Sequence, residues 1–182
     1  ISEVSPEEVC AFCKDNQFTE NAFFTTAFAW LLAKLSGNEG ALFAAIYNGR
    51  TRPETLRIMG MLVKTYPVYV NFEKGGNTKD TIREVQKLIQ ELTANDIYSF
   101  AEAARDYDVN ADILFAYQGD NFTCFTVAGE PALQIPQPFE DAKEALSVDV
   151  WKKDTGYTVV MLYRVDLYRS KQIEWMCDLY GM

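Results

Sequence analysis

The sequence predicts an α/β fold, in which helices pack on one mixed sheet to form a single-domain α/β sandwich. Three observations lead to this prediction. Helical and strand-like segments alternate in the first half of the chain, strand-like runs dominate the second half, and no Gly-, Pro- or Ser-rich linker divides the 182 residues. We therefore expect 1–182 to fold as one unit, large enough to bury a substantial apolar core.

Capping signals and apolar periodicity predict the first two helices. The first is expected over 6–16, because Ser5 and Glu8 can form a capping box and a proline occupies the first turn. Thr19 is expected to cap the second, over 20–36, which stops at a glycine. The second segment is apolar on nearly every side, so we expect it to be central in the molecule.

The remaining elements follow from apolar periodicity, β-branched content and turn residues. Strands are predicted at 41–47, 68–72, 113–117, 122–127, 147–152 and 158–163. Helices are predicted over 78–92, over 100–106 with Ser99 as the cap, and from a Ser170 cap to about 180. The proline-rich stretch 129–138 is expected to be an extended loop.

Composition excludes some classes of function. The net charge of −9 would repel phosphate backbones, so we expect no nucleic-acid partner. No apolar run approaches the roughly 20 residues of a membrane span, and no secretory leader is evident. A cytoplasmic protein without a membrane partner is therefore expected. Because the chain does not begin with Met, we expect it to be a piece of a longer protein.

The cysteines include one Cys-x-x-Cys pair, Cys10 and Cys13. A zinc site would need a second such pair or histidines, and neither is present, so no metal is expected. A redox pair is expected just after a strand, whereas this one lies within a helical pattern. We therefore interpret both side chains as structural and packed on the core.

Conventional catalytic groups are absent. The chain has no histidine, which excludes Ser-His and Cys-His nucleophiles. The adjacent carboxylates at 106 and 108, and at 140 and 141, are interpreted as solvated loop charges. The Gly75-Gly76-Asn77 turn lacks the lysine and the preceding strand of a phosphate-binding loop. We expect no catalytic residue in this chain, and binding is a better prospect than catalysis.

The most informative stretch is 46–72, IYNGRTRPETLRIMGMLVKTYPVYVNF. A strand ends in an Asn-Gly-Arg turn, and a short helical segment then leads to Gly60 and a second strand. This order resembles the C-terminal half of nonribosomal peptide synthetase condensation domains, where a Gly-Arg turn precedes a segment of the Ile-Gly-Leu-Phe-Val-Asn-Thr kind. The catalytic His-His-x-x-x-Asp-Gly motif of that family lies in the other half.

The resemblance extends over nearly the whole chain. The segment 95–100 is similar to the family's His-Asn-Gln-Asp-Tyr-Pro-Phe-Glu stretch and agrees with it at Asn95, Tyr98 and Phe100. Further similar segments are the helix 19–37, the strand 112–118 that ends in Tyr-Gln, and the stretches 142–148 and 163–173. Lys64 departs from the pattern, because the family has asparagine there.

The resemblance implies a fold and a set of partners. It implies a chloramphenicol-acetyltransferase-like half-domain, the C-terminal subdomain of two α/β lobes that form a V around a channel. Carrier proteins bring thioesters into that channel on phosphopantetheine arms, and an amide forms. The implied partners are the N-terminal lobe of the same domain, peptidyl carrier proteins and an adjacent adenylation domain. No cofactor is expected on this chain, and the lobe alone is expected to be inactive.

The resemblance also implies candidate binding residues. Arg50, Arg52 and Lys64 could attract the phosphate of a phosphopantetheine arm, or the two arginines could mainly brace the turn. A glycine at Gly60 indicates close backbone packing near the channel. Tyr117 and Gln118 end a strand and could line the channel, or serve as core and cap.

Other readings remain open. The chain could be a noncatalytic condensation-like module that docks a carrier protein or a neighbouring synthetase domain, or an unrelated α/β binding domain. Epimerisation and heterocyclisation domains share the architecture, so the reaction subtype is not determined. A lobe without its partner should expose an apolar face, and we therefore expect self-association.

Overall fold

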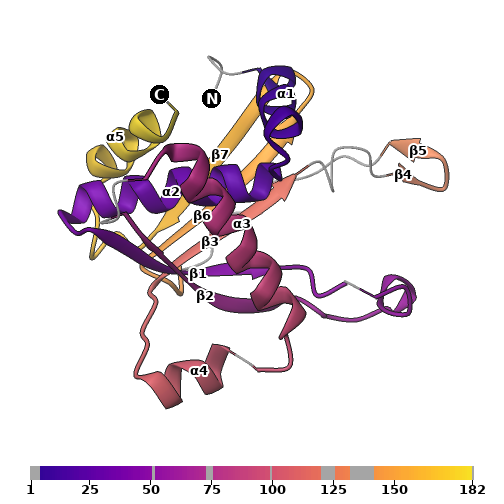
Figure 1. Cartoon of the computed structure of the whole chain (residues 1–182). Coiled ribbons are helices and arrows are strands. Elements are labelled where there is room, and N and C mark those ends of the chain that lie inside the picture. The colour runs from indigo at the N-terminus through magenta and orange to yellow at the C-terminus, as the bar shows by residue number, and fades with distance from the viewer. Residues whose placement is uncertain are drawn as a thin grey trace.

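A five-stranded mixed sheet forms the centre of the computed structural model, which describes residues 5–50, 52–72, 76–98, 100–119, 126–131 and 142–181 (Figure 1). The strand order is β2-β1-β3-β6-β7. The bounds are β1 (Gly40–Tyr47), β2 (Lys64–Asn71), β3 (Ile113–Gly119), β6 (Leu146–Lys153) and β7 (Gly156–Tyr163). The three inner strands are parallel to one another, whereas β2 and β7 pair antiparallel to their neighbours. The predicted mixed sheet is confirmed.

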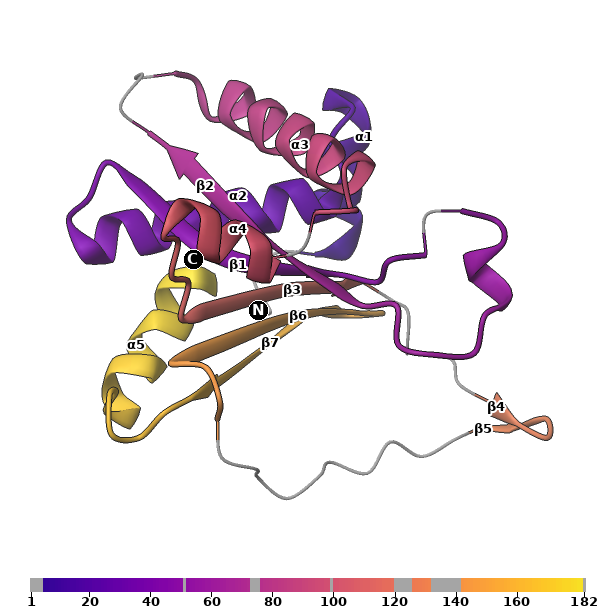
Figure 2. The same ribbon diagram turned by 90° about the horizontal axis from the view of Figure 1, so that it is seen from below.

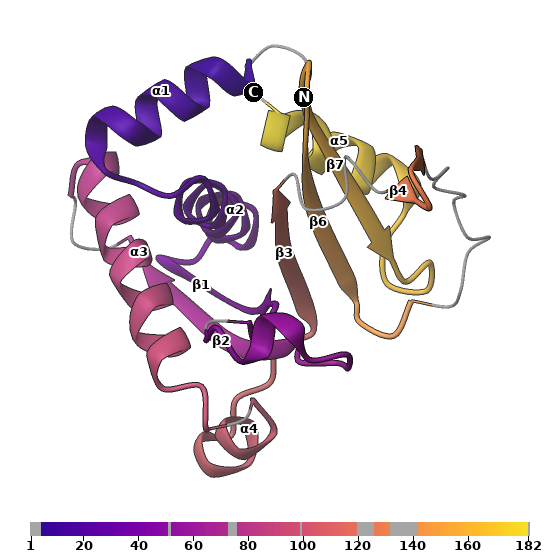
Figure 3. The same cartoon turned by 90° about the vertical axis from the view of Figure 1, so that its right-hand side faces the viewer.

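The helices of the described part pack against this sheet and against one another (Figure 3). The helices are α1 (Pro6–Asn16), α2 (Glu20–Ser36), α3 (Thr78–Ala94), α4 (Phe100–Tyr107) and α5 (Ser170–Gly181). Helix α2 contacts α1, α3, α5, β1 and β3, so it is the central helix that its apolar sequence predicts. Helix α4 is set apart from the others and contacts β2 (Figures 1 and 3).

The core forms where α2 meets the inner strands. The Phe28 ring stacks on Phe115 of β3 at 4.9 Å between centroids and meets Phe43 of β1 edge-on at 5.3 Å. The caps predicted for the first two helices are present. Ser5 Oγ accepts from the Glu8 amide at 3.1 Å, the Glu8 carboxylate accepts from the Ser5 amide, and Thr19 Oγ1 caps α2.

Strand β2 is longer than predicted. It begins at Lys64 rather than at residue 68, and all of it pairs with β1, from Tyr47↔Lys64 to Gly40↔Asn71. Pro67, the residue before the predicted start, lies within the strand. Because β2 is an edge strand, a residue without an amide hydrogen is tolerated there.

The cap of α5 also differs from the prediction. Ser170 is the first residue of the helix, and its Oγ accepts a hydrogen bond from the Tyr163 hydroxyl at 3.0 Å. Gln172 instead accepts the Arg169 amide with its side-chain oxygen, at 2.9 Å. The predicted Ser99 cap lies outside the described residues.

A small hairpin forms outside the main sheet. Strand β4 (Thr126–Val127) pairs antiparallel with β5 (Glu130–Pro131). The first covers the end of the strand predicted at 122–127, whose earlier residues lie outside the described part. Strand β5 lies within the stretch 129–138, which was predicted to be an extended loop. A tight turn at 128–129 brings 130–131 back to pair with β4, so the start of that stretch is a strand. In the described ranges, no helix is long and apolar enough to span a membrane.

The connection between β1 and β2, residues 48–63, projects from the body of the molecule (Figure 2). We call it the β1–β2 excursion. It contains a short 3-10 turn, η1 (Thr55–Arg57), and carries exposed apolar side chains. Several of the residues predicted to bind a carrier arm lie on it or at its base.

Candidate functional site

Arg50 holds the excursion together from inside. Its guanidinium donates hydrogen bonds to three backbone carbonyls, those of Thr55 at 2.5 Å, Ile58 at 2.9 Å and Gly60 at 3.0 Å. Five donors in a rigid fork make arginine suited to such bracing. Two roles were considered for Arg50, binding a phosphate or bracing the turn, and these hydrogen bonds favour bracing.

The close backbone approach expected at Gly60 occurs instead at Gly49. A Cβ at Gly60 would meet no atom within 4 Å, so nothing there requires glycine. At Gly49 the backbone has φ +68°, and a Cβ would lie 1.9 Å from the Leu62 carbonyl oxygen. The close packing predicted at Gly60 is therefore wrong, because the backbone approach occurs at Gly49, where the two ends of the excursion meet.

Lys64 at the start of β2 pairs with Asp96, which follows α3. Its ammonium lies 3.0 Å from Asp96 Oδ2 and donates to the Asp96 backbone oxygen at 2.7 Å. The Tyr47 hydroxyl donates to the same carboxylate. Hydrogen bonds from Tyr47 and Lys64 hold the pKa of Asp96 below its usual value. A phosphate approaching Lys64 would therefore compete with Asp96.

Arg52 lies near this pair. It lines a shallow hollow of about 280 Å³ together with Gln90, Thr93 and Asp96. Its charge also contributes to lowering the pKa of Asp96. The guanidinium is exposed, so Arg52 is better placed than Arg50 to meet an anion from solution.

Tyr117 and Gln118 lie at the carboxyl end of β3, where the ladder with β6 is irregular. Tyr117 pairs with Val150 and Gly119 with Trp151, so Gln118 is the extra residue of a bulge. The Gln118 amide donates to Asp149 of β6 at 2.8 Å. Bulges redirect side chains at strand ends and are frequent beside binding sites.

A half-buried polar cluster at the start of α2 holds Tyr117 in place. Glu20, the first residue of α2, accepts hydrogen bonds from the Tyr117 hydroxyl, from the Tyr157 hydroxyl at 3.0 Å and from Lys152 Nζ at 2.6 Å. Burial alone would raise the pKa of Glu20, but these three bonds outweigh it, and the pKa is lowered. The cluster joins α2 to β3, β6 and the start of β7.

A hollow of about 420 Å³ opens beside this cluster. It is lined by residues from the start of α2 and the ends of β3 and β6, namely Thr19, Glu20, Asn21, Tyr117, Gln118, Gly119 and Lys152. Nearby, burial raises the pKa of Asp149, and the hydrogen bond from Gln118 opposes the shift only in part. The pKa of Asp149 is thus raised, whereas the pKa values of Glu20 and Asp96 are lowered.

Two of the groups predicted to have no catalytic role, Cys13 and Asp106, are engaged in packing or in a surface ion pair. Cys13 is buried, and burial raises the pKa of its thiol to about 11, so the structural interpretation of Cys13 is confirmed. Asp106 forms a surface ion pair with Arg105 at 2.8 Å. Within the described ranges, no group of three or more His, Cys, Asp or Glu side chains could hold a metal ion.

The candidate residues lie at one edge of the sheet, where the parallel strands β1 and β3 end. They form two clusters, one of Arg52 and Lys64 around Asp96 and one of Tyr117 and Gln118 beside Glu20. Strands β1 and β3 are parallel, so Arg50 and Tyr117 follow or end strands at the same edge. Glu20, Asp96 and Asp149 were not predicted as parts of either cluster. An aspartate in the alternating strand LSVDVWKK is a signal that could have revealed Asp149. For Glu20 and Asp96, no local pattern marks the long-range partners.

Comparison with known proteins identifies one family. The family model described as "Condensation domain" matches residues 1–181. Surfactin synthase subunit 1 of Bacillus subtilis is 27% identical over 173 residues, which cover 88% of this chain and 5% of that protein. Nonribosomal peptide synthetase criC of Aspergillus cristatus is 25% identical over 166 residues, which cover 90% of this chain and 7% of the relative. The chain thus spans less than a tenth of either relative.

Solved structures share the fold at low identity. A four-domain nonribosomal peptide synthetase, holo-AB3403 bound to AMP and glycine, superposes with a TM-score of 0.79 at 16% identity, over 94% of this chain and 15% of that one. The epimerization domain from the third module of tyrocidine synthetase B gives 0.66 at 18% identity, over 93% and 41%. PapA2 acyl transferase gives 0.71 at 13% identity, over 96% and 40%.

Proposed function

This chain belongs to the condensation-domain family, and from that premise we propose that it is the C-terminal lobe of a condensation domain of a nonribosomal peptide synthetase. In this role it supplies one wall of a channel. Thioesters carried on phosphopantetheine arms enter the channel, and an amide bond joins them. The group that handles the proton belongs to the other lobe, so the lobe alone makes no amide.

One observation carries the proposal. The chain aligns over nearly its whole length with about two fifths of a single solved epimerization domain, and it has no histidine. A domain of this family that depends on a histidine would therefore have to take it from residues outside this chain. The same proposal makes the N-terminal lobe, peptidyl carrier proteins and an adjacent adenylation domain its partners, in the cytoplasm.

The described geometry supports separate roles within the wall. Tyr117 and Gln118 face the hollow at the carboxyl end of β3, where a channel wall needs polar groups in fixed positions. Arg50 shapes the excursion, and Arg52 and Lys64 place two cations beside Asp96. In our proposal these two cations attract the phosphate of the carrier arm, and Gly60 lies on the excursion that borders the channel.

The direct test compares this chain with the longer polypeptide that includes the residues encoded before Ile1. Carrier proteins loaded with an acyl donor and an amine acceptor are supplied, and amide formation is measured by mass spectrometry. We expect product only from the longer polypeptide, and its loss when histidine in the added lobe is replaced by alanine. Amide synthesis by residues 1–182 unaided would overturn the proposal.

The arm contact has its own test in the longer polypeptide. Lys64→Glu should weaken carrier binding several-fold at low salt and less at high salt, because exposed charges are screened. Binding is measured by titration calorimetry at two salt concentrations, with Lys171→Glu on α5 as the control. Unchanged affinity at both concentrations would remove Lys64 from the site while leaving the lobe assignment intact.

A second candidate function is a noncatalytic module that docks a carrier protein or a neighbouring domain. The excursion favours it, because Met59 is 100% exposed and Met61 92% exposed, and such side chains serve docking rather than chemistry. The two functions differ in one result. A longer polypeptide that binds carriers but forms no amide supports docking alone.

A further inference from the structure

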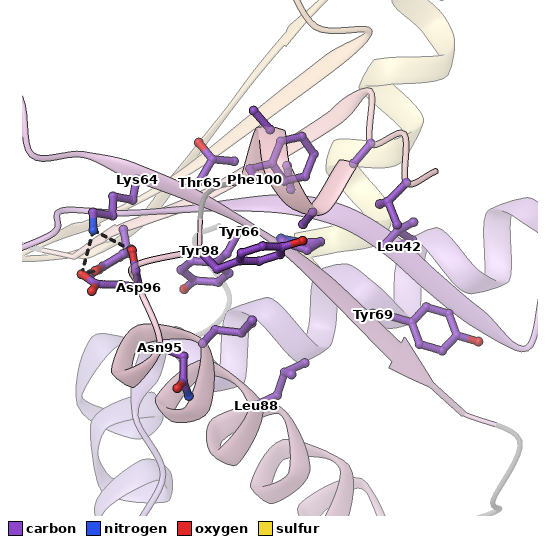
Figure 4. A pocket seen from close by; sticks show the side chains of 18 of the residues that line it. Leu42, Lys64, Thr65, Tyr66, Tyr69, Leu88, Asn95, Asp96, Tyr98 and Phe100 are labelled. Atoms are coloured by element: carbon purple, nitrogen blue, oxygen red, sulfur yellow. Dashed lines mark hydrogen bonds and ion pairs between the residues drawn. The ribbon is translucent and has the colours of Figure 1, made fainter. Parts of the chain in front are cut away.

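A large hollow lies away from the residues of the proposed channel wall, apart from Lys64 at one end. It is a groove of about 1360 Å³ between β2, the second half of α3 and α4. In Figure 4, Lys64 and Asp96 mark one end, and the rings of Tyr66, Tyr98 and Phe100 lie in the middle. Leu42 and Tyr69 mark the other end.

Helix α4 lines the groove with two small side chains between the larger Phe100 and Tyr107. Ala101 and Ala103 line the groove, and Ala103 is buried. A helix with leucine at such positions would fill the space against the sheet. The other walls are mainly apolar, formed by the buried Tyr66 and by the half-buried Leu88, Leu92, Phe100 and Leu114.

The dimensions fit an extended ligand. The volume exceeds the roughly 300–1,000 Å³ of sites for drug-sized molecules. Strand β2 lines the groove from Lys64 to Tyr69, which at about 3.3 Å per residue is about 17 Å. A helix of about eleven residues has the same length at 1.5 Å per residue. The groove is therefore long enough for about three helical turns.

The charges around the groove are unbalanced. Its lining includes three carboxylates, Glu91, Asp96 and Glu144, and one ammonium, that of Lys64. The ammonium already pairs with Asp96. Glu91 is exposed and forms a surface ion pair with Lys87 at 3.6 Å, and Glu144 is half-buried. Because exposed pairs of this kind are weak, a ligand with positive charge beside its apolar surface would meet complementary partners at both carboxylates.

The edge of β2 is unsuited to a further strand. Strand addition needs a continuous row of amide and carbonyl groups along the sheet edge. Pro67 lies within β2 and has no amide hydrogen to offer. A helix satisfies its own backbone hydrogen bonds and needs only an apolar surface, so the groove suits a helix better than a strand.

We propose that the groove between β2, α3 and α4 binds a basic amphipathic helix of a partner protein, with its apolar face on Tyr66 and Leu88 and its basic side chains at Glu91 and Glu144. This docking does not depend on the proposed role in amide synthesis. The helix anchors the chain to its partner by residues i, i+3, i+4 and i+7, as in other helix-in-groove complexes.

The test uses a fluorescein-labelled amphipathic peptide of leucine and lysine, fourteen residues long, and measures its binding to the 182-residue chain by fluorescence anisotropy. The charge-reversed peptide, with glutamate in place of lysine, is the ligand control. Ala103→Leu fills the groove and should abolish binding while raising Tm. Glu91→Lys with Glu144→Lys should weaken binding at least tenfold.

Two surface variants outside the groove control for nonspecific attraction. Val165→Asp removes an apolar side chain that is 85% exposed, and Glu174→Lys changes charge on α5. Both should keep the affinity within twofold. Equal binding by Ala103→Leu, or by the charge-reversed peptide, would overturn the proposal. So would binding of labelled decanoic acid in the groove without binding of the peptide, because that result assigns the groove to acyl chains.

Discussion

At the scale of single residues, long-range polar contacts decide how the candidate site is built. Glu20 joins α2 to strands β3, β6 and β7 through Tyr117, Lys152 and Tyr157. In the sequence, Glu20 is only an acidic residue in the first turn of a helix, where a negative charge is stabilised by the helix dipole. The sequence could predict the helix start, but the hydrogen-bond partners of Glu20 lie 97 to 137 residues away.

We predict that Glu20→Gln destabilises the fold by about 1–3 kcal/mol at pH 7, because the amide loses the charge that its three donors stabilise. The pKa of Glu20 is lowered on folding, so its contribution is present above the unfolded value and is lost as pH falls through the folded one. Urea denaturation at pH 7 and near pH 3 measures this. The difference between variant and wild type should shrink in acid, and an equal difference at both values would contradict the mechanism.

Gly49 is the residue at which the excursion tolerates no side chain. We predict that Gly49→Ala costs about 2–4 kcal/mol, because it combines a left-handed backbone with contact against the Leu62 carbonyl. Gly60→Ala is the matched control and should change stability by less than about 1 kcal/mol. Urea midpoints compare the two. If both alanine variants unfold at the same urea concentration, the close approach at Gly49 is unimportant.

At the scale of elements, local signals predicted well where a helix or strand depends on its own residues. Capping boxes and periodicity placed α1, α2 and α3. They failed for the start of β2, which extends across Pro67 because β1 offers a partner for every residue. They failed again for the cap of α5, where the Tyr163 hydroxyl of β7 donates a hydrogen bond to Ser170 Oγ. In both cases a neighbouring strand overrode the local preference.

The excursion is an element whose shape depends on one side chain. Arg50→Ala removes three hydrogen bonds to its carbonyls and should ease local opening by about 1–2 kcal/mol, which is roughly tenfold in the open population. Limited trypsin digestion after Arg57 should accelerate accordingly, while the global urea midpoint stays close to that of wild type. Arg52→Ala is the control. Equal digestion rates would show that Arg50 does not brace the excursion.

At the scale of the whole molecule, apolar side chains gather where no described element covers them. The excursion exposes Leu56, Ile58, Met59, Met61 and Val63. A surface of this kind is common at interfaces with other proteins and promotes association when uncovered. We therefore expect copies of this chain to associate through the apolar side chains of the excursion.

We predict that the 182-residue chain associates at high concentration and that Met59→Asp with Met61→Asp makes it monomeric. The carboxylates would have to be desolvated in any apolar contact, which is costly. Sedimentation velocity at several concentrations measures the association. Val165→Asp, outside the excursion, should leave it unchanged. A wild-type chain that stays monomeric at every concentration would refute the prediction.

Composition and local patterns were enough to predict the α/β class, the order of most helices and strands, and the lack of histidine chemistry. These properties depend on composition and on patterns within a few residues, which the sequence displays directly. The tertiary structure alone decided that Lys64 meets Asp96, that Glu20 collects three partners and that α4 leaves a groove beside β2. Each of these depends on which strands pair and how closely helices approach them, and such contacts between distant residues have no local signal in the chain.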